Sequence, residues 1–298
     1  MNDMRSTNRM LWVAIQRNPT SGSGRRTQLI IELITELRRL GIRPRLFSNR
    51  DRLKKYLADP DRLQNLLCLV AAGGDGTVGD LVNRYPDLPI AILPLGTENL
   101  LARYLKIEKS GIQVAHMIAA NRRHRFDTGT IGERRFLIMA SLGFDAAVIH
   151  LMQRQRQGHI TRWSYFNVIW SAIRLYRHPK MNVFLDGSAT PLTGRLAVIT
   201  NIPMYALKLP IAPDALGDDG LLDLHLFQQG SLLQILRYLY HIVLGSHETL
   251  PDVFHATAKS MRIECEQPIP IQADGDACGI TPVTISINPQ SCLLVVPE

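Results

Sequence analysis

A loop of glycines with one aspartate and one threonine, Gly73-Gly74-Asp75-Gly76-Thr77, joins an apolar segment at 66–71 to a helical pattern at 77–84. Glycine permits positive φ and lets the backbone approach a ligand with no Cβ in the way. The helix that begins there offers unpaired N–H groups and the positive end of its dipole, which favour phosphate. Because Asp75 alone would repel phosphates, the pattern predicts a nucleotide bound with a metal ion, and phosphoryl transfer as the reaction.

Two further polar loops follow apolar segments in the same part of the chain. Asn18 to Gly24 comes after the segment at 12–15, and Pro94 to Asn99, which contains Thr97, comes after the segment at 89–93. Either loop alone is equally well explained as a turn or a helix cap. In open parallel sheets, however, ligands bind at the carboxyl ends of the strands. Three such loops on successive strands therefore favour one shared nucleotide site.

Two acidic segments lie in the second half of the chain. The segment at 212–221 places carboxylates in a glycine-bounded turn, which suits a hard cation that prefers oxygen ligands. Its composition alone favours an ordinary acidic turn. The segment at 272–276 places Asp274 and Asp276 on either side of a glycine. An aspartate at the end of a strand can act as a general base toward a hydroxyl, although Asp-Gly is also a strong hairpin signal.

The secondary-structure pattern changes near residue 125. Before it, apolar strand-like segments alternate with helical patterns at 25–40, 51–58, 77–84, 99–105 and 110–120, which predicts a parallel sheet covered on both faces. After it, β-prone segments come in pairs, with helical stretches at 144–156, 163–176 and 231–244. We therefore expect a doubly wound α/β domain at 1–125 and an antiparallel β-rich domain at 126–298.

Bulk composition limits the partners. The 298-residue chain carries a formal net charge of +8, which favours an anionic partner such as a phosphorylated ligand or an acidic membrane surface. There is no basic stripe interleaved with aromatic residues, so we expect no nucleic acid partner. No apolar run approaches the ~20 residues needed to cross a bilayer, so any membrane contact is expected to be peripheral. Four cysteines without metal or disulfide spacing fit a cytoplasmic protein.

Taken in order, these segments resemble the diacylglycerol kinase catalytic-domain family. The resemblance runs through Asn18–Gly22, Gly73–Thr77, Pro94–Asn99, Ser141–Ala146, Pro213–Leu224 and Asp274–Asp276, and so covers nearly the whole chain. It is strongest to the soluble bacterial lipid kinases of the family and weaker to sphingosine kinases. NAD kinases share the glycine loop alone. The chain has neither a Walker A motif nor a dinucleotide-binding fingerprint.

The resemblance implies a nucleotide-binding α/β domain and a β-sandwich domain, with the active site in a cleft between them. It implies a catalytic set of Asp274 as the base, Asp276 as support for the metal–water network, and Asp75. It also implies a Mg²⁺ site at Asp219 and the carbonyls of Leu216 and Leu221, separate from the Mg²⁺ that accompanies ATP. The residues expected to bind ATP are Asn18, Ser48, Gly73, Gly74, Asp75, Gly76, Thr77, Thr97 and Asn99.

The function implied is an ATP- and Mg²⁺-dependent lipid kinase, peripheral on an anionic membrane. One alternative is a kinase of a soluble acceptor such as NAD. Another is a regulator that binds nucleotide or lipid without catalysis, which the intact Asp75, Asp219, Asp274 and Asp276 disfavour. The apolar face of the helix at 163–176 is interpreted either as lipid site or as core. The helix at 231–244 is predicted to be core.

Overall fold

A computed structural model describes residues 10–17, 24–143, 146, 179–205 and 209–298 of the chain. Asn18 lies outside this described part, as do the helices expected at 144–156 and 163–176 apart from Ala146. The structure divides into two compact units: unit 1 comprises Met1–Arg125 and Cys292–Glu298, and unit 2 comprises Phe126–Ser291. The division expected from the sequence differs from this one in residues 292–298, which return to unit 1.

Unit 1 is built on a parallel sheet with the order β2-β1-β3-β4. The strands are β1 (Trp12–Arg17), β2 (Arg43–Phe47), β3 (Leu66–Gly73) and β4 (Ile90–Pro94). The end of β18 (Val283–Val295) adds to β4 in parallel, with Leu294 opposite Ile90. β1, β3 and β4 are buried along almost their whole length, as strands covered on both faces must be.

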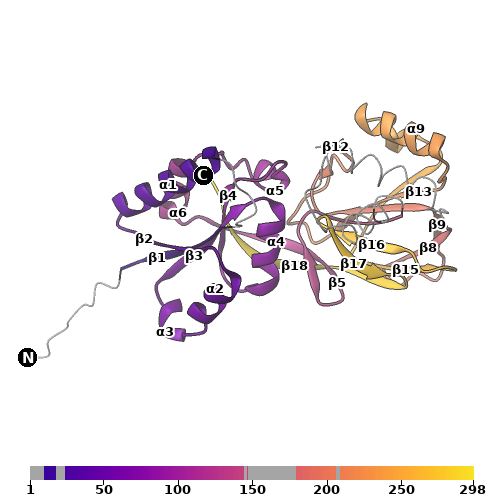
Figure 1. The fold of residues 1–298 in the computed structure, drawn as a ribbon. Coiled ribbons are helices and arrows are strands. Elements are labelled where there is room, and N and C mark those ends of the chain that lie inside the picture. The colour runs from indigo at the N-terminus through magenta and orange to yellow at the C-terminus, as the bar shows by residue number, and fades with distance from the viewer. Residues whose placement is uncertain (1–9, 18–23, 144–145, 147–178, 206–208) are drawn as a thin grey trace, which may run out of the picture. The chain divides into compact units, whose positions relative to one another are not determined.

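Helices cover both faces of this sheet, as Figure 1 shows with α1 and α6 on one face and α2 and α3 on the other. The helices are α1 (Gly24–Arg39), α2 (Arg50–Leu57), α3 (Pro60–Leu63), α4 (Asp75–Arg84), α5 (Leu100–Tyr104) and α6 (Gly111–Ala120). A Cβ at Gly111 would lie 2.3 Å from the carbonyl oxygen of Leu29, so glycine lets α6 approach the backbone of α1. The doubly wound α/β fold predicted for this part of the chain is confirmed.

Unit 2 contains two sheets. The first has the order β14-β13-β10-β7-β16-β17 with antiparallel pairing throughout. Its strands are β14 (Val253–Ala258), β13 (Leu222–Phe227), β10 (Leu196–Thr200), β7 (Met139–Leu142), β16 (Pro270–Ala273) and β17 (Asp276–Ile280). The second contains β18, β15 (Ser260–Cys265), β8 (Met181–Leu185) and β9 (Leu192–Gly194), with β5 (Arg123–Ile131) and β6 (Arg134–Phe136) joined through β18. A separate short pair is formed by β11 (Met204–Tyr205) and β12 (Leu209–Pro210).

Both sheets of unit 2 contribute to one core. Leu142, Ile199 and Leu224 come from the first sheet, and Val183 and Ile263 come from the second. All five side chains are fully buried. The unit is thus a β-sandwich, and the predicted fold class is confirmed. β18 is a single strand of 13 residues.

The prediction that the helix near 231–244 is core is wrong. This helix, α9 (Leu232–Val243), buries only Tyr238 and Ile242. Tyr238 packs on the ring of Phe227, while the apolar side chains of Leu233, Leu236 and Val243 are exposed. α9 is apolar around most of its circumference, so the sequence pattern alone could not show which stripe faces the sheet. Among the described residues, no helix combines the length and the apolar character needed to span a bilayer.

Candidate active site

The glycine loop forms the junction between β3 and α4. β3 ends at Gly73, and α4 begins at Asp75 after Gly74, whose backbone is extended. The N–H of Thr77 donates to the carbonyl of Gly74 at 2.8 Å. A Cβ at Gly73 would lie 2.1 Å from Oγ1 of Thr77, so the turn has no room for a larger residue there. The first amides of α4 therefore lie at the carboxyl end of β3, where a phosphate would meet the positive end of the helix dipole.

The loop after β4 packs directly on the glycine loop. The N–H of Leu95 donates to the carbonyl of Gly73 at 2.8 Å. A Cβ at Gly96 would lie 2.6 Å from Cα of Gly74, so the two backbones touch. The side chain of Asn99 closes the second loop, since its Oδ1 accepts from the Gly96 N–H and its Nδ2 donates to the Gly96 carbonyl. Two loops named from the sequence thus form one backbone-lined surface, in which Asn99 holds the turn.

Asp75 turns its carboxylate toward α5. Its Oδ2 accepts from the N–H of Leu100 at 3.0 Å, and its Oδ1 accepts from the N–H of Leu101 at 3.2 Å. Burial raises the pKa of Asp75, although these two amides lower it in part. The carboxylate therefore supplies the acceptors that the first turn of α5 lacks, and it ties the two loops together. This structural role was not foreseen from the sequence.

A cavity of about 360 Å³ opens in unit 1 beside the glycine loop. Its lining includes Ser48, which follows β2, and Thr77 of α4, both expected from the sequence to approach the nucleotide. Gln16, Arg17, Asn49, Arg50, Asp51 and Asp80 complete the lining. Thr97, also expected to contact ATP, is exposed and is not among these lining residues. Arg17 and Arg50 bring positive charge to this wall, Asp51 and Asp80 balance it, and Arg50 lies 3.4 Å from Asp80. The cavity is therefore polar, with no net formal charge in its lining.

In unit 2, Asp274 and Gly275 form the two-residue hairpin turn between β16 and β17. Both have positive φ, +48° and +83°, as a type I′ turn requires. The carboxylate of Asp274 folds back onto the chain between β6 and β7. Its Oδ2 accepts from the N–H of Leu137 at 2.8 Å, and its Oδ1 accepts from Ile138 and Met139 at 3.0 Å each. Three backbone donors thus fix the orientation of this carboxylate.

Asp276 lies two residues further on and makes a different contact. One of its carboxylate oxygens, Oδ2, pairs with Arg134 Nη2 at 2.6 Å, and about half of its side chain is exposed. Desolvation lowers the pKa of Arg134, but the neighbouring carboxylates raise it overall. Both sequence interpretations of this segment therefore hold. Asp274-Gly275 is a hairpin turn, and the two carboxylates lie at the ends of strands.

The loop before β13 contains the expected cation ligands. Asp219 is exposed, and its Oδ1 accepts from the N–H of Leu221 at 2.9 Å. In the described part of the chain, the backbone hydrogen bonds outside the helices and strands include none to the carbonyl of Leu216 or of Leu221. One carboxylate and two carbonyls in an exposed loop fit a hard cation such as Mg²⁺, which keeps several waters.

Sequence profiles of two known domains match the chain. The diacylglycerol kinase catalytic domain matches residues 13–131. The YegS C-terminal NAD kinase beta sandwich-like domain matches residues 138–296, which is more than half of the chain. The chain belongs to the family that joins these two domains. Membership of this kinase family implies ATP as the phosphoryl donor.

Individual relatives of this family match almost the whole chain. A diacylglycerol kinase from Mycobacterium tuberculosis is 28% identical over 94% of both chains. A diacylglycerol kinase from Staphylococcus carnosus is 24% identical over 89% of this chain and 88% of its own. Two crystal structures from Bacillus anthracis str. Sterne, one described as a diacylglycerol kinase, have the same fold. Each aligns over 97% of this chain and 97% of its own chain, with TM-scores of 0.74 and 0.68. At 20% and 17% identity, these two show the shared fold.

Sequence reasoning missed Asp127, which is fully buried in this kinase-family chain. Its Oδ2 accepts from the N–H of Gly220 at 2.7 Å, and its Oδ1 accepts from the N–H of Gln290 at 2.6 Å. Asp127 therefore anchors the loop that contains Asp219. The sequence gives no distinct signal for Asp127, because it lies in a strand segment with three basic residues before it and two threonines after it.

Proposed function

We propose that this chain is an ATP- and Mg²⁺-dependent kinase that transfers the γ-phosphoryl group to the hydroxyl of a lipid, diacylglycerol or a related one. The observation that carries the proposal is the backbone contact of Gly74 with Gly96 beside the cavity lined by Ser48 and Thr77. A phosphate can approach backbone amides closely only where side chains are absent. The family to which the chain belongs supports a kinase reaction.

In this proposal the amides of the glycine loop bind the phosphates. The loop consists of Gly73, Gly74, Gly76 and Thr77, and Ser48 approaches the nucleotide from the cavity wall. Arg17 adds a positive charge to this wall, where Arg50 is paired with Asp80. Asn18, Thr97 and Asn99 complete the set proposed from the sequence. Asp75 acts by holding the two loops in register through its hydrogen bonds to α5.

Phosphoryl transfer consists mostly of positioning and charge neutralisation. The lipid hydroxyl oxygen forms a bond to the γ-phosphorus, the bond from that phosphorus to the β,γ-bridging oxygen breaks, and ADP leaves. Asp274 accepts the hydroxyl proton, and Asp276 assists beside it. When bound, Mg²⁺ supplies positive charge to the transferring phosphates. A second Mg²⁺ at Asp219, Leu216 and Leu221 would stabilise the loop before β13.

A direct assay compares acceptors. Purified protein with labelled ATP and Mg²⁺ is expected to phosphorylate a lipid presented in mixed micelles and to leave NAD unmodified. A panel of diacylglycerol, a sphingoid base and phosphatidylglycerol would identify the lipid. Phosphorylation of NAD instead would establish the soluble-acceptor alternative. Nucleotide binding without turnover on any of these acceptors would favour a non-catalytic regulator.

A lipid substrate requires the protein to contact a membrane, and the exposed face of α9 is suited to that contact. Apolar side chains cover its outer face: Leu233, Leu236, Leu239, Tyr240 and Val243 are exposed, with Leu233 at 79%. The opposite side is tied to unit 2 by Tyr238, whose hydroxyl donates to Asp252 at 2.7 Å, and by the Arg237–Asp252 ion pair. We propose that this face enters an anionic bilayer, to which the net charge of +8 attracts the protein.

Leu236→Glu is expected to weaken binding to anionic phospholipid vesicles by about tenfold, because burying a leucine side chain contributes about 1.5–3 kcal/mol. Vesicle co-sedimentation at low and high salt measures this, and wild-type binding should fall as salt rises. Ile31→Glu, at an exposed apolar position of α1, is the matched control. If both variants bind vesicles like the wild type, α9 does not contact the membrane. A change of oligomeric state in light scattering, with unchanged vesicle binding, would assign the face to a second copy of the chain instead.

A further inference from the structure

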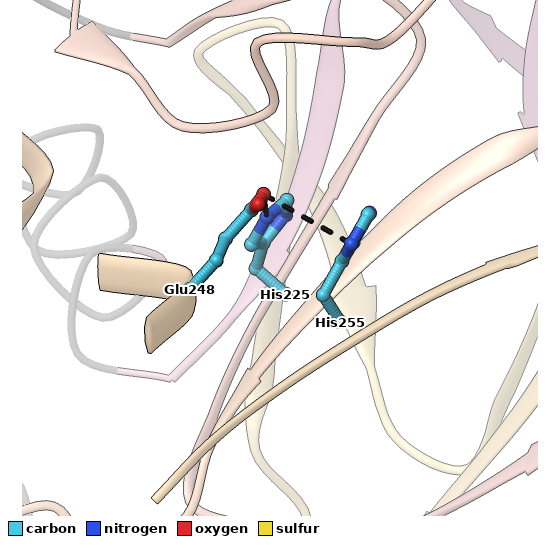
Figure 2. Close-up of side chains that lie close together, drawn as sticks. All are labelled: His225, Glu248 and His255. Atoms are coloured by element: carbon cyan, nitrogen blue, oxygen red, sulfur yellow. Dashed lines mark hydrogen bonds and ion pairs between the residues drawn. The ribbon is translucent and has the colours of Figure 1, made fainter. Parts of the chain in front are cut away.

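A cluster of two histidines and a glutamate lies in unit 2 on segments that the kinase proposal does not use. His225 is on β13, His255 is on β14, and Glu248 is in the short 3₁₀ helix η2 (His247–Thr249). β13 and β14 pair antiparallel with His225 directly opposite His255. Figure 2 shows Glu248 beside the two rings. One ligand atom from each residue lies within 4.8 Å of the other two.

Contacts within the cluster centre on one carboxylate oxygen. Oε1 of Glu248 lies 2.8 Å from Nε2 of His225 and 3.9 Å from Nδ1 of His255. A tetrahedral zinc ion about 2.0–2.1 Å from each ligand places the ligand atoms about 3.3 Å apart. The two observed distances lie on either side of that value. Small side-chain movements are therefore enough to bring the three atoms around one ion.

Burial of the cluster is uneven, and this determines which side chains can move. The His225 side chain is fully buried, while those of Glu248 and His255 are about one-third exposed. The two ring centroids are 4.6 Å apart with only 16° between the ring planes, so the nitrogen lone pairs of the two rings lie in nearly parallel planes. Because His225 is buried, the small adjustment that ion binding requires would fall on the partly exposed side chains of His255 and Glu248. The exposed side leaves a position for water, as in sites with three protein ligands.

A carboxylate next to His255 sets the orientation of its ring. Nε2 of His255 lies 3.3 Å from Oδ1 of Asp223, which leaves Nδ1 on the side of Glu248. A metal-binding histidine usually gives its other ring nitrogen to a carboxylate or carbonyl, which fixes the tautomer. Asp223 is thus placed to hold His255 with Nδ1 available.

We propose that His225, Glu248 and His255 bind one divalent transition-metal ion, zinc foremost, with Asp223 orienting His255. Two imidazole nitrogens and one carboxylate favour zinc or a similar metal, whereas Mg²⁺ prefers oxygen ligands alone. The site is therefore chemically distinct from the Mg²⁺ proposed with ATP and at Asp219. The ion would link η2 to the β13–β14 pair, and would thereby also restrain α9, which precedes η2 in the chain.

Metal binding by the full-length, tag-free protein tests this proposal. After treatment with a chelator, the protein is expected to bind one equivalent of Zn²⁺ in isothermal titration, with a higher midpoint of thermal unfolding. Excess Mg²⁺ should not displace the zinc. Co²⁺ in place of Zn²⁺ should give visible absorption bands of a nitrogen–oxygen site without a sulfur-to-cobalt charge-transfer band, which excludes the cysteines as ligands.

Variants of the exposed ligands separate this site from surface binding. His255→Ala and Glu248→Gln should each weaken Zn²⁺ binding by at least about tenfold, and Asp223→Asn by about 10–100-fold. His116→Ala is the matched control, because His116 pairs with Glu36 at 2.9 Å in unit 1 and is not part of a three-ligand cluster among the described residues. Full Zn²⁺ affinity in both His255→Ala and Glu248→Gln, or the absence of stoichiometric Zn²⁺ binding by the wild type, would overturn the proposal.

Discussion

Asp274→Asn is expected to lower lipid kinase turnover by about 10²–10⁴-fold, the range that a positioned acid–base group contributes. The loss should appear in kcat, because the carboxylate acts on the hydroxyl proton during transfer. Steady-state assays with lipid micelles at saturating MgATP measure it. Binding of MgATP should persist, since the proposed ATP cavity is lined only by residues of unit 1.

The same substitution also has a structural effect that the experiment must separate. An asparagine would turn an NH₂ group toward the N–H of Leu137 or of Ile138, and the loss of one such bond costs about 1–3 kcal/mol. Thermal unfolding of the variant therefore accompanies the kinetics. If the activity loss only follows the unfolded fraction, or if the folded variant keeps turnover within tenfold of the wild type, Asp274 is not the base of the reaction.

Asp276→Asn provides the comparison within the same turn. Its ion pair with Arg134 is about half exposed, so its removal should change stability by no more than about 1 kcal/mol. We expect a smaller loss of turnover than in Asp274→Asn. The reverse order of the two variants would assign proton removal to Asp276 and leave Asp274 as a residue that holds the chain between β6 and β7.

Much of unit 1 could be predicted because its signals are local. Continuous apolar strands, each followed by a polar loop and a helical pattern, specify a parallel sheet, and the loops then meet at one edge for topological reasons. The Asp274-Gly275 turn was equally visible, since few dipeptides accept two positive φ values. In these segments the residues that determine the structure are adjacent in the sequence.

Other features depend on contacts that sequence patterns do not contain. The opposition of His225 and His255 follows from the β13–β14 register, and α9 and η2 separate those strands in the chain. The bonds from Asp75 to α5 depend on how two loops pack, so the sequence suggested only its phosphate-side role. The buried face of α9 is the one that contains Tyr238 and Ile242. In the sequence, these two residues cannot be distinguished from the neighbouring apolar residues of the helix, which are exposed.

Gly96→Ala should abolish detectable MgATP binding and lower the unfolding midpoint. Its Cβ would lie 2.6 Å from Cα of Gly74 and 2.7 Å from Oδ1 of Asn99, and only the second of these can move aside without shifting backbone. Forcing a methyl group into such a contact typically costs about 1–3 kcal/mol. Because the shift would fall on the glycine loop itself, isothermal titration with MgATP should register a loss beyond that explained by unfolding.

Gly76→Ala tests the other half of the argument, because nothing lies within 4 Å of a Cβ built there. Gly76 is in the first turn of α4 with ordinary φ, so alanine should keep or slightly raise the unfolding midpoint. The added methyl group would nevertheless occupy the surface over which the phosphates are proposed to lie, and MgATP affinity should fall. Wild-type MgATP affinity in Gly76→Ala would mean that the nucleotide does not approach this backbone. If Gly96→Ala has wild-type stability and MgATP affinity, the contact between the two loops is not required for nucleotide binding. The Gly74–Gly96 contact would then no longer support the proposed function.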